Sequence, residues 1–375
     1  MNKHLKRIAA SVSALCLAAT FCSAISAGAV SLYPKTVMTK SATFWNKYAN
    51  KNIKLEFSTS KEDYQDYLYE PGRGIKVVGT VTGPMRTINV DYNNVLGLHS
   101  GSYDYSQAAQ NALYNTTKVH DFFNSIGCKR SDITVAVNDI AGYTIGNTDG
   151  QRINAWGKDN TLFFGMGSSD QSKADAFKFL GSATDVVAHE YMHLITGEQL
   201  GWDSYDGKSL ETCALMEAYS DIMAELADER GDWKVGATIF TNNNSSRDYS
   251  YRNLANPKNT KNPRTPDTTY QTNYGTWKKY SSRSDNPTPD VAGSTVISHA
   301  AYLMHEMGYS NQTLGKIWLK SLSKYDNVDT NNVTFTDCRN AFEEAAFEVL
   351  GQTGGRYYTA QVFQLMTAFD EVGIY

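Results

Sequence analysis

Two histidines and a glutamate stand at a spacing that suits a metal ion. Residues 189–193 read His-Glu-Tyr-Met-His, so His189 and His193 are four positions apart. On a helix, positions i and i+4 share a face, and both imidazoles can direct a nitrogen at one point. Neutral imidazoles suit Zn²⁺, which in catalytic sites has three protein ligands and an open position for water. Glu190 lies about 100° further around the helix, where its carboxylate can reach that water and act as general base.

A pair of acids follows on the next predicted helix. Glu217 and Asp221 are four residues apart, so they also share a face. Glu217 can complete a ligand set of two histidines and one glutamate, and Asp221 can accept the second ring N–H of a ligating histidine. Standing alone, the two would be solvated acids on an amphipathic helix. The histidines could likewise only form hydrogen bonds on a polar face, but apolar residues on both sides of the motif favour a buried metal site.

The elements that must position these residues begin with a β-rich part. Apolar and polar residues alternate in several short runs that read as strands, at residues 75–81, 85–90, 133–137, 154–156 and 161–166. One helix interrupts them, at residues 106–123. Residues 30–69 form a short segment whose role the sequence does not declare.

A helical part follows. The 3.6-residue periodicity predicts helices at residues 173–198, 209–229, 294–306, 313–325, 336–350 and 358–369. The polar stretch at 241–289 reads as a long loop. A β-rich half followed by a helical half predicts an α+β fold with a cleft between two lobes. We expect the lobes at residues 70–200, ending in the helix with the histidines, and 201–375.

The N-terminus has the three parts of a secretory signal. Basic residues precede an apolar stretch at residues 8–25, and Ala27 and Ala29 are small residues of the kind that signal peptidase reads. We expect residues 1–29 to be removed and the remaining chain to be extracellular. The alternative is an N-terminal membrane anchor, but Ser and Thr interrupt the apolar stretch.

Charge and cysteine usage argue against other classes of protein. The formal net charge is −4, and loss of the signal with Lys3, Lys6 and Arg7 takes it to −7. An acidic chain is a poor partner for nucleic acid or for an anionic membrane surface. No second apolar run reaches the length of a membrane span. The cysteines that remain are too few and odd in number for a disulfide framework, namely Cys128, Cys213 and Cys338.

Residues 185–193, followed by 217–221, resemble the thermolysin-like neutral zinc metallopeptidases. Asn154-Ala155 resembles the edge-strand segment that holds the substrate backbone in that family, and Arg252 resembles the arginine that binds a substrate carbonyl. The resemblance implies a two-lobed fold with the active-site helix between the lobes. It also implies zinc, held by the two histidines and Glu217, and endopeptidase cleavage before bulky apolar residues. The expected partners are polypeptide substrates, and we expect a monomer.

Some positions depart from the family pattern. The family usually has a histidine that donates a hydrogen bond to the oxyanion of the tetrahedral intermediate, and this chain has Val291 there. Losing such a donor costs about 10²–10³ in rate, unless Tyr205 supplies the hydrogen bond. Residues 30–69 are also too short to equal the family's long pro-region. The alternative function is therefore a zinc-retaining, catalytically weakened binding or regulatory protein. A purely structural zinc is less favoured, because such sites have four protein ligands.

A second metal is expected from the same resemblance. Asp185, Asp228 and Asp232 match acidic positions that bind calcium in the family. Further acids are common where this chain has Lys234 and Ala237. Three carboxylates can hold one Ca²⁺ with backbone carbonyls and water. Alternatively, Lys234 replaces the ion as an internal countercharge.

Overall fold

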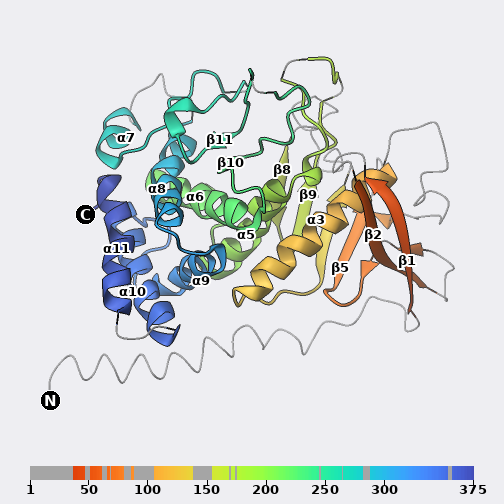
Figure 1. The fold of residues 1–375 in the computed structure, drawn as a ribbon, viewed down its shortest axis with the longest axis horizontal. Helices are drawn as coiled ribbons and strands as arrows, with labels where there is room; N and C mark the ends of the chain where they lie inside the picture. The colour runs from red at the N-terminus through yellow and green to blue at the C-terminus, as the bar shows by residue number, and fades with distance from the viewer. Residues whose placement is uncertain are drawn as a thin grey trace.

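A computed structural model describes most of the chain beyond residue 36 (Figure 1). The described ranges are residues 37–46, 51–60, 66–67, 69–79, 86–87, 105–137, 154–168, 170–173, 175–244, 246–263, 265–281, 288–353 and 357–375. The predicted signal at residues 1–29 lies outside them, as does most of the strand predicted at residues 85–90.

A mixed sheet forms the β-rich part. Its strands follow the order β4-β5-β7-β9-β8, with β6 beside β5. They are β4 (Tyr69–Glu70), β5 (Ile75–Gly79), β6 (Arg86–Thr87), β7 (Ile133–Val137), β8 (Ala155–Lys158) and β9 (Thr161–Phe164). The pairs β5–β7 and β7–β9 are parallel, and β8 runs antiparallel to β9. In the part of the sheet that the structure describes, β8 is therefore an edge strand.

A smaller sheet precedes it, in the segment whose role the sequence leaves open. The hairpin of β1 (Val37–Asn46) and β2 (Lys51–Ser60) is antiparallel over ten residue pairs, and β3 (Asp66–Tyr67) pairs with β2. Figure 1 places this hairpin at the end of the molecule opposite the last helices.

Two helices join the sheet to the helical part. Helix α3 (Tyr105–Ser125) packs against the strands β5 and β7 and against helix α5. Its predicted range is confirmed within two residues. Helix α5 (Thr184–Leu200) carries the His-Glu-Tyr-Met-His motif and ends at Gly201, whose φ of 67° is the left-handed conformation of a glycine C-cap. Figure 1 shows α5 in the middle of the fold, between the strands and the remaining helices.

The helix predicted at residues 173–198 begins later than expected. Residue Phe177 pairs with Phe240 in an isolated β-bridge, and a short 3₁₀ turn, Leu180–Ser182, intervenes before α5. The backbone hydrogen bonds that a helix would use are therefore committed to other partners. Apolar periodicity alone could not distinguish the buried, non-helical segment before residue 184 from the helix that follows it.

Helix α6 (Leu210–Ala227) is the centre of the helical part. Ser209 caps its N-terminus and accepts a hydrogen bond from the Thr212 N–H at 3.2 Å. Every residue from Thr212 to Leu226 is buried, as expected for a helix that is apolar on most sides. It packs against α5 and α8 (Pro289–Glu306).

The remaining elements surround α6. They are β10 (Lys234–Val235), β11 (Arg252–Asn253), α7 (Tyr274–Ser281), α9 (Asn311–Ser321), α10 (Phe335–Thr353) and α11 (Tyr358–Glu371), with short 3₁₀ turns at Pro257–Asn259 and Leu322–Lys324. Helix α7 lies in the stretch predicted as loop; Trp277 anchors it by stacking on Phe335 at 4.9 Å. The described helices include none with the length and apolar character needed to cross a membrane. The predicted α+β class is confirmed.

Candidate active site

Three side chains from α5 and α6 converge in a group that could hold a metal ion. The Nε2 atoms of His189 and His193 are 3.2 Å apart, and each lies 3.6 Å from an oxygen of Glu217. Two ligands about 2.0–2.1 Å from a tetrahedral zinc ion are roughly 3.3 Å apart. The three donor atoms therefore have the separations and chemistry of a three-ligand zinc site. They are the one group of at least three potential ligands found among the described residues.

Hydrogen bonds to the other ring nitrogens orient both histidines. His189 Nδ1 lies 3.0 Å from Asp221 Oδ1, and His193 Nδ1 lies 3.3 Å from Ser220 Oγ. Such partners select the tautomer that leaves Nε2 free for a metal. The sequence predicted Asp221 but missed Ser220. Because Ser220 is three residues after Glu217 on the same helix, its spacing was the available signal.

Arg252 in β11 holds Asp221 from the opposite side. Its Nε and Nη2 donate to the two carboxylate oxygens at 2.5 and 2.6 Å, a bidentate pair. Asp221 is fully buried, so the pair fixes the acid that fixes His189. The Nη1 of Arg252 forms no hydrogen bond with the described residues.

Glu190 is buried beside the ligands and points at the same space. Burial raises the pKa of Glu190 to about 7. Burial also opposes ionisation of Glu217, but the charges of His189 and Arg252 prevail and lower its pKa to about 2. The pKa values of these two carboxyl groups therefore differ widely although both groups line one pocket. The pKa of Glu190 suits proton transfer near neutral pH, and that of Glu217 keeps its carboxylate charged. The Gly157 N–H donates to the Glu190 carboxylate from β8.

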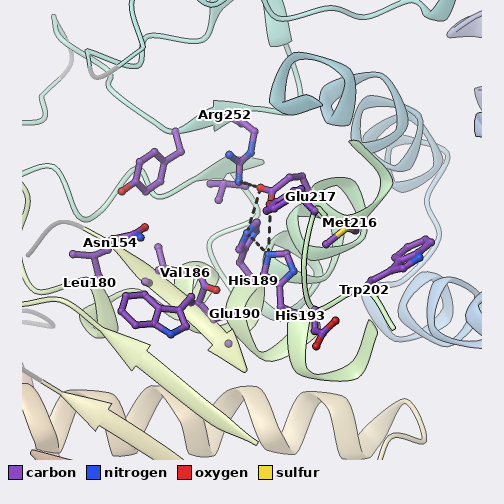
Figure 2. A pocket seen from close by; sticks show the side chains of 17 residues that line it. Asn154, Leu180, Val186, His189, Glu190, His193, Trp202, Met216, Glu217 and Arg252 are labelled. Atoms are coloured by element: carbon purple, nitrogen blue, oxygen red, sulfur yellow. Dashed lines mark hydrogen bonds and ion pairs between the residues drawn. The ribbon is translucent and has the colours of Figure 1, made fainter. Parts of the chain in front are cut away.

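A cavity of about 400 Å³ opens over these groups. Asn154, Ala155 and Arg252, which the sequence linked to substrate binding, line it together with the three ligands. Figure 2 shows Asn154 on one side of the cavity and Arg252 on another, with His189, His193 and Glu217 pointing at one another between them. The edge strand β8 forms one wall.

Tyr205 is the further residue proposed for catalysis, and its side chain reaches the ligands. The Tyr205 hydroxyl donates to Glu217 Oε1 at 2.5 Å, and the ring is 47% exposed. The nearby charge of Glu217 raises the pKa of the phenol, so the hydroxyl keeps its proton. Val291 lies in the first turn of α8 and is not among the residues that line the cavity.

The acids predicted as a calcium site surround a cation of the chain itself. Asp185, Asp228 and Asp232 each form an ion pair with Arg230. Lys234, the countercharge considered from the sequence, instead pairs with Asp248, at 2.8 and 2.9 Å from its two oxygens. The prediction that Lys234 is the countercharge of these acids was therefore wrong, because Arg230 takes that role. Arg230 was missed, because the sequence does not show which acids a four-residue turn brings together.

Several known proteins are similar to parts of this chain. Residues 205–374 match the family model described as thermolysin metallopeptidase, alpha-helical domain. Neutral protease B of Bacillus subtilis is 31% identical over 221 residues, which cover 56% of this chain and 35% of that protein. Bacillolysin of Brevibacillus brevis is 27% identical over 331 residues, which cover 85% of this chain and 55% of that protein. An extracellular elastase of Staphylococcus epidermidis is 27% identical over 282 residues, which cover 72% of this chain and 47% of that protein.

The chain thus spans between about a third and just over half of these relatives' length. Among solved structures, the precursor of protealysin, a metalloproteinase from Serratia proteamaculans, matches with a TM-score of 0.56. The match has 17% identity and covers 80% of this chain and 87% of that one. At that identity the likeness shows the fold, and it agrees with the two-lobed arrangement predicted above.

Proposed function

We propose that the chain is a secreted, zinc-dependent endopeptidase of the thermolysin-like metallopeptidase family, whose helical-domain model matches residues 205–374. The observation that carries the proposal is the set of His189, His193 and Glu217, with a cavity on its open side and Glu190 beside it. Three protein ligands leave a position free for water, which distinguishes a catalytic site from a structural one. The donor set also argues against the structural alternative, because no fourth protein ligand joins it among the described residues.

Zinc, when bound, supplies Lewis acidity that makes water a nucleophile near neutral pH and polarises a peptide carbonyl. The residues of the chain do the rest. Glu190 accepts the proton of the attacking water and later delivers it to the departing amine. Asp221 and Ser220 hold the ligand imidazoles in the required orientation.

The substrate backbone is held on both sides of the scissile bond. Asn154 directly precedes the edge strand β8 and Ala155 is its first residue, so free backbone groups of this edge can pair with an extended peptide. Arg252 can donate from Nη1 to a substrate carbonyl, because its other two nitrogens are engaged with Asp221. Both sides of the cavity thereby accept a polypeptide in extended form, which supports cleavage within a chain.

Tyr205 supplies the hydrogen bond that the family's missing histidine would provide. Its phenol donates to Glu217 and lines the cavity, whereas Val291 has no donor. A preorganised donor at the developing oxyanion is worth about 10²–10³ in rate. On this proposal the hydroxyl turns from Glu217 to the substrate oxyanion during the reaction.

Secretion is part of the proposal. The relatives from Staphylococcus epidermidis are named extracellular elastases, and residues 1–29 have the form of a cleaved signal. Calcium is not part of the proposal, because the guanidinium of Arg230 already pairs with each of the three acids that would hold the ion.

The second candidate is a zinc-retaining binding or regulatory protein of the same fold. Val291 favours it, because an efficient peptidase of this family would have a donor at that position. Against it stands Glu190, since a module that only binds peptides has no chemical need for a buried carboxyl at the open metal position.

Hydrolysis of an unfolded protein separates the two candidates. The purified chain from residue 30, loaded with zinc, is incubated with casein. A peptidase releases peptides, stops when 1,10-phenanthroline removes the metal, and recovers when zinc is returned. A protein that contains one zinc ion per chain and releases no peptides would be the binding protein instead.

A further inference from the structure

Arg230 stands among three carboxylates, one from α5 and two from its own turn after α6. Its Nη2 lies 2.7 Å from Asp185 Oδ2, its Nε 2.6 Å from Asp228 Oδ2, and its Nη1 3.3 Å from Asp232 Oδ2. Each of the three guanidinium nitrogens therefore meets a different acid. A planar guanidinium can do this, because its donors point outward in a fixed fork.

The two closest of these acids are buried. Asp185 is fully buried and Asp228 is 6% exposed. Asp185 Oδ2 also accepts from the Gly236 N–H at 2.7 Å, and its Oδ1 from the Val186 N–H at 2.8 Å. Burial raises the pKa of Asp185 to about 6 against the opposing charge of Arg230, which still leaves the group ionised at neutral pH. A buried carboxylate of this kind needs a cation next to it.

A fourth acid in the same region, Glu225, is buried without a hydrogen-bond partner among the described residues. It lies on α6 and is 1% exposed. Burial, reinforced by the negative charge of Asp185, raises its pKa well above the usual value. Burial and the neighbouring charge thus both favour the protonated form of Glu225, and that form does not require a cation beside it.

The geometry does not fit a calcium ion between these acids. Ca²⁺ needs about 6–8 oxygen ligands at 2.3–2.6 Å. Here the facing oxygens of Asp185 and Asp228 are each within hydrogen-bond distance of one guanidinium, which fills the space between them. An ion could bind only after Arg230 had left.

We propose that Arg230 takes the place of the calcium ion expected from the family resemblance, so that this chain folds and holds its metal-binding helices without calcium. The replacement of calcium by Arg230 matters for the metal site because the acids around Arg230 lie on the helices that carry the ligands. Asp185 lies in the first turn of α5, four residues before His189, and Asp228 caps the C-terminus of α6, the helix of Glu217. Arg230 thereby ties together the two helices that supply all three ligands.

The first test uses the unaltered protein. Thermal unfolding of the zinc-loaded chain is followed in resin-treated, calcium-free buffer and in about 10 mM CaCl₂, with MgCl₂ at equal concentration as ionic control. This concentration saturates sites with dissociation constants of about 10⁻⁴–10⁻³ M. We expect the Tm to be the same in all three buffers. A calcium-specific rise of about 2–4 °C, the size that saturation of such a site produces in a chain of this length, would overturn the proposal.

Variants then test the residue itself. Arg230→Ser removes the cation and opens the space; we expect the Tm to fall by about 5–10 °C and calcium to restore part of the loss. Arg230→Lys keeps the positive charge but loses the planar guanidinium with its three donor nitrogens. We expect its Tm to lie between those of the unaltered protein and Arg230→Ser. Lys234→Ala is the matched control, since its ammonium pairs with Asp248 outside the cluster, and it should gain no response to calcium. A Tm unchanged in Arg230→Ser would also contradict the proposal. If that variant fails to fold, calcium titration of the unaltered chain still decides.

Discussion

Gly157 and Glu190 approach so closely that a β-carbon on Gly157 would lie 2.3 Å from the Glu190 carbonyl oxygen. Gly157 belongs to the edge strand β8 and Glu190 to the active-site helix α5. The strand proposed to hold the substrate therefore touches the backbone of the residue proposed as general base. Glycine is required here for close approach of two backbones.

Replacing Gly157 with alanine should separate β8 from α5. Overpacking costs about 1–3 kcal/mol, and a shift of about 1 Å in catalytic groups can cost about 10²-fold in rate. We expect a lower Tm and kcat/KM on a peptide substrate lowered by at least about tenfold. Gly275→Ala on α7 is the control, because its nearest neighbour would be an ordinary contact at 3.4 Å. Equal activity of the two variants would refute the close-approach argument.

Asp221→Asn should weaken zinc binding. The amide can no longer accept both donors of Arg252 while it also accepts from His189 Nδ1. Loss of such an orienting partner typically lowers metal affinity about 10–100-fold. Competition with a chromogenic zinc chelator measures the change. Asp370→Asn, which alters an exposed ion pair with Arg339, should leave the affinity as it is.

Tyr205→Phe tests the proposed oxyanion donor. We expect kcat to fall by about 10²–10³ with KM little changed, because the hydroxyl acts in the transition state. The Tm should change little, since the ring is 47% exposed. Tyr357→Phe, at a tyrosine that is 78% exposed, serves as control. A Tyr205→Phe enzyme with full kcat would mean that another group meets the oxyanion.

The cysteines give a prediction that depends on protonation. Cys128, Cys213 and Cys338 are all buried, and the structure joins no two of them by a disulfide bond. Burial raises the pKa of Cys338 to about 12 and also raises that of Cys213, so at pH 8 both thiols remain protonated and poorly nucleophilic. For the chain from residue 30, we expect almost no reaction of Cys338 and Cys213 with Ellman's reagent in the native protein, and three thiols per chain in denaturant. Rapid native reaction of Cys338 would show that its environment opens.

The ligand set could be predicted because helical spacing is a local property. Four residues separate His189 from His193, and Glu217 from Asp221, so each pair shares a face whatever the rest of the fold does. Pairing two helices from sequence also required the family resemblance, since no local rule shows that α5 and α6 meet. The strands at 133–137 and 161–166 were predictable for the same local reason, because their alternation is short and clear.

What could not be predicted depends on contacts between distant segments. Arg230 is recognisable as a countercharge only once Asp185, 45 residues earlier, lies beside it. Helix α7 was hidden in a polar stretch, because one buried tryptophan, Trp277, rather than a repeated apolar face, fixes it. The hairpin β1–β2 lies in a segment without clear alternation, and its pairing is set by the partner strand.

Glu190→Gln is the most direct test of the central claim, that this site hydrolyses peptide bonds with Glu190 as base. The substitution keeps the shape of the side chain and removes its ability to take a proton. Zinc content per chain and casein hydrolysis are measured side by side with the unaltered protein. The account predicts one zinc ion in both proteins and cleavage by the unaltered protein alone. Undiminished cleavage by Glu190→Gln would contradict it.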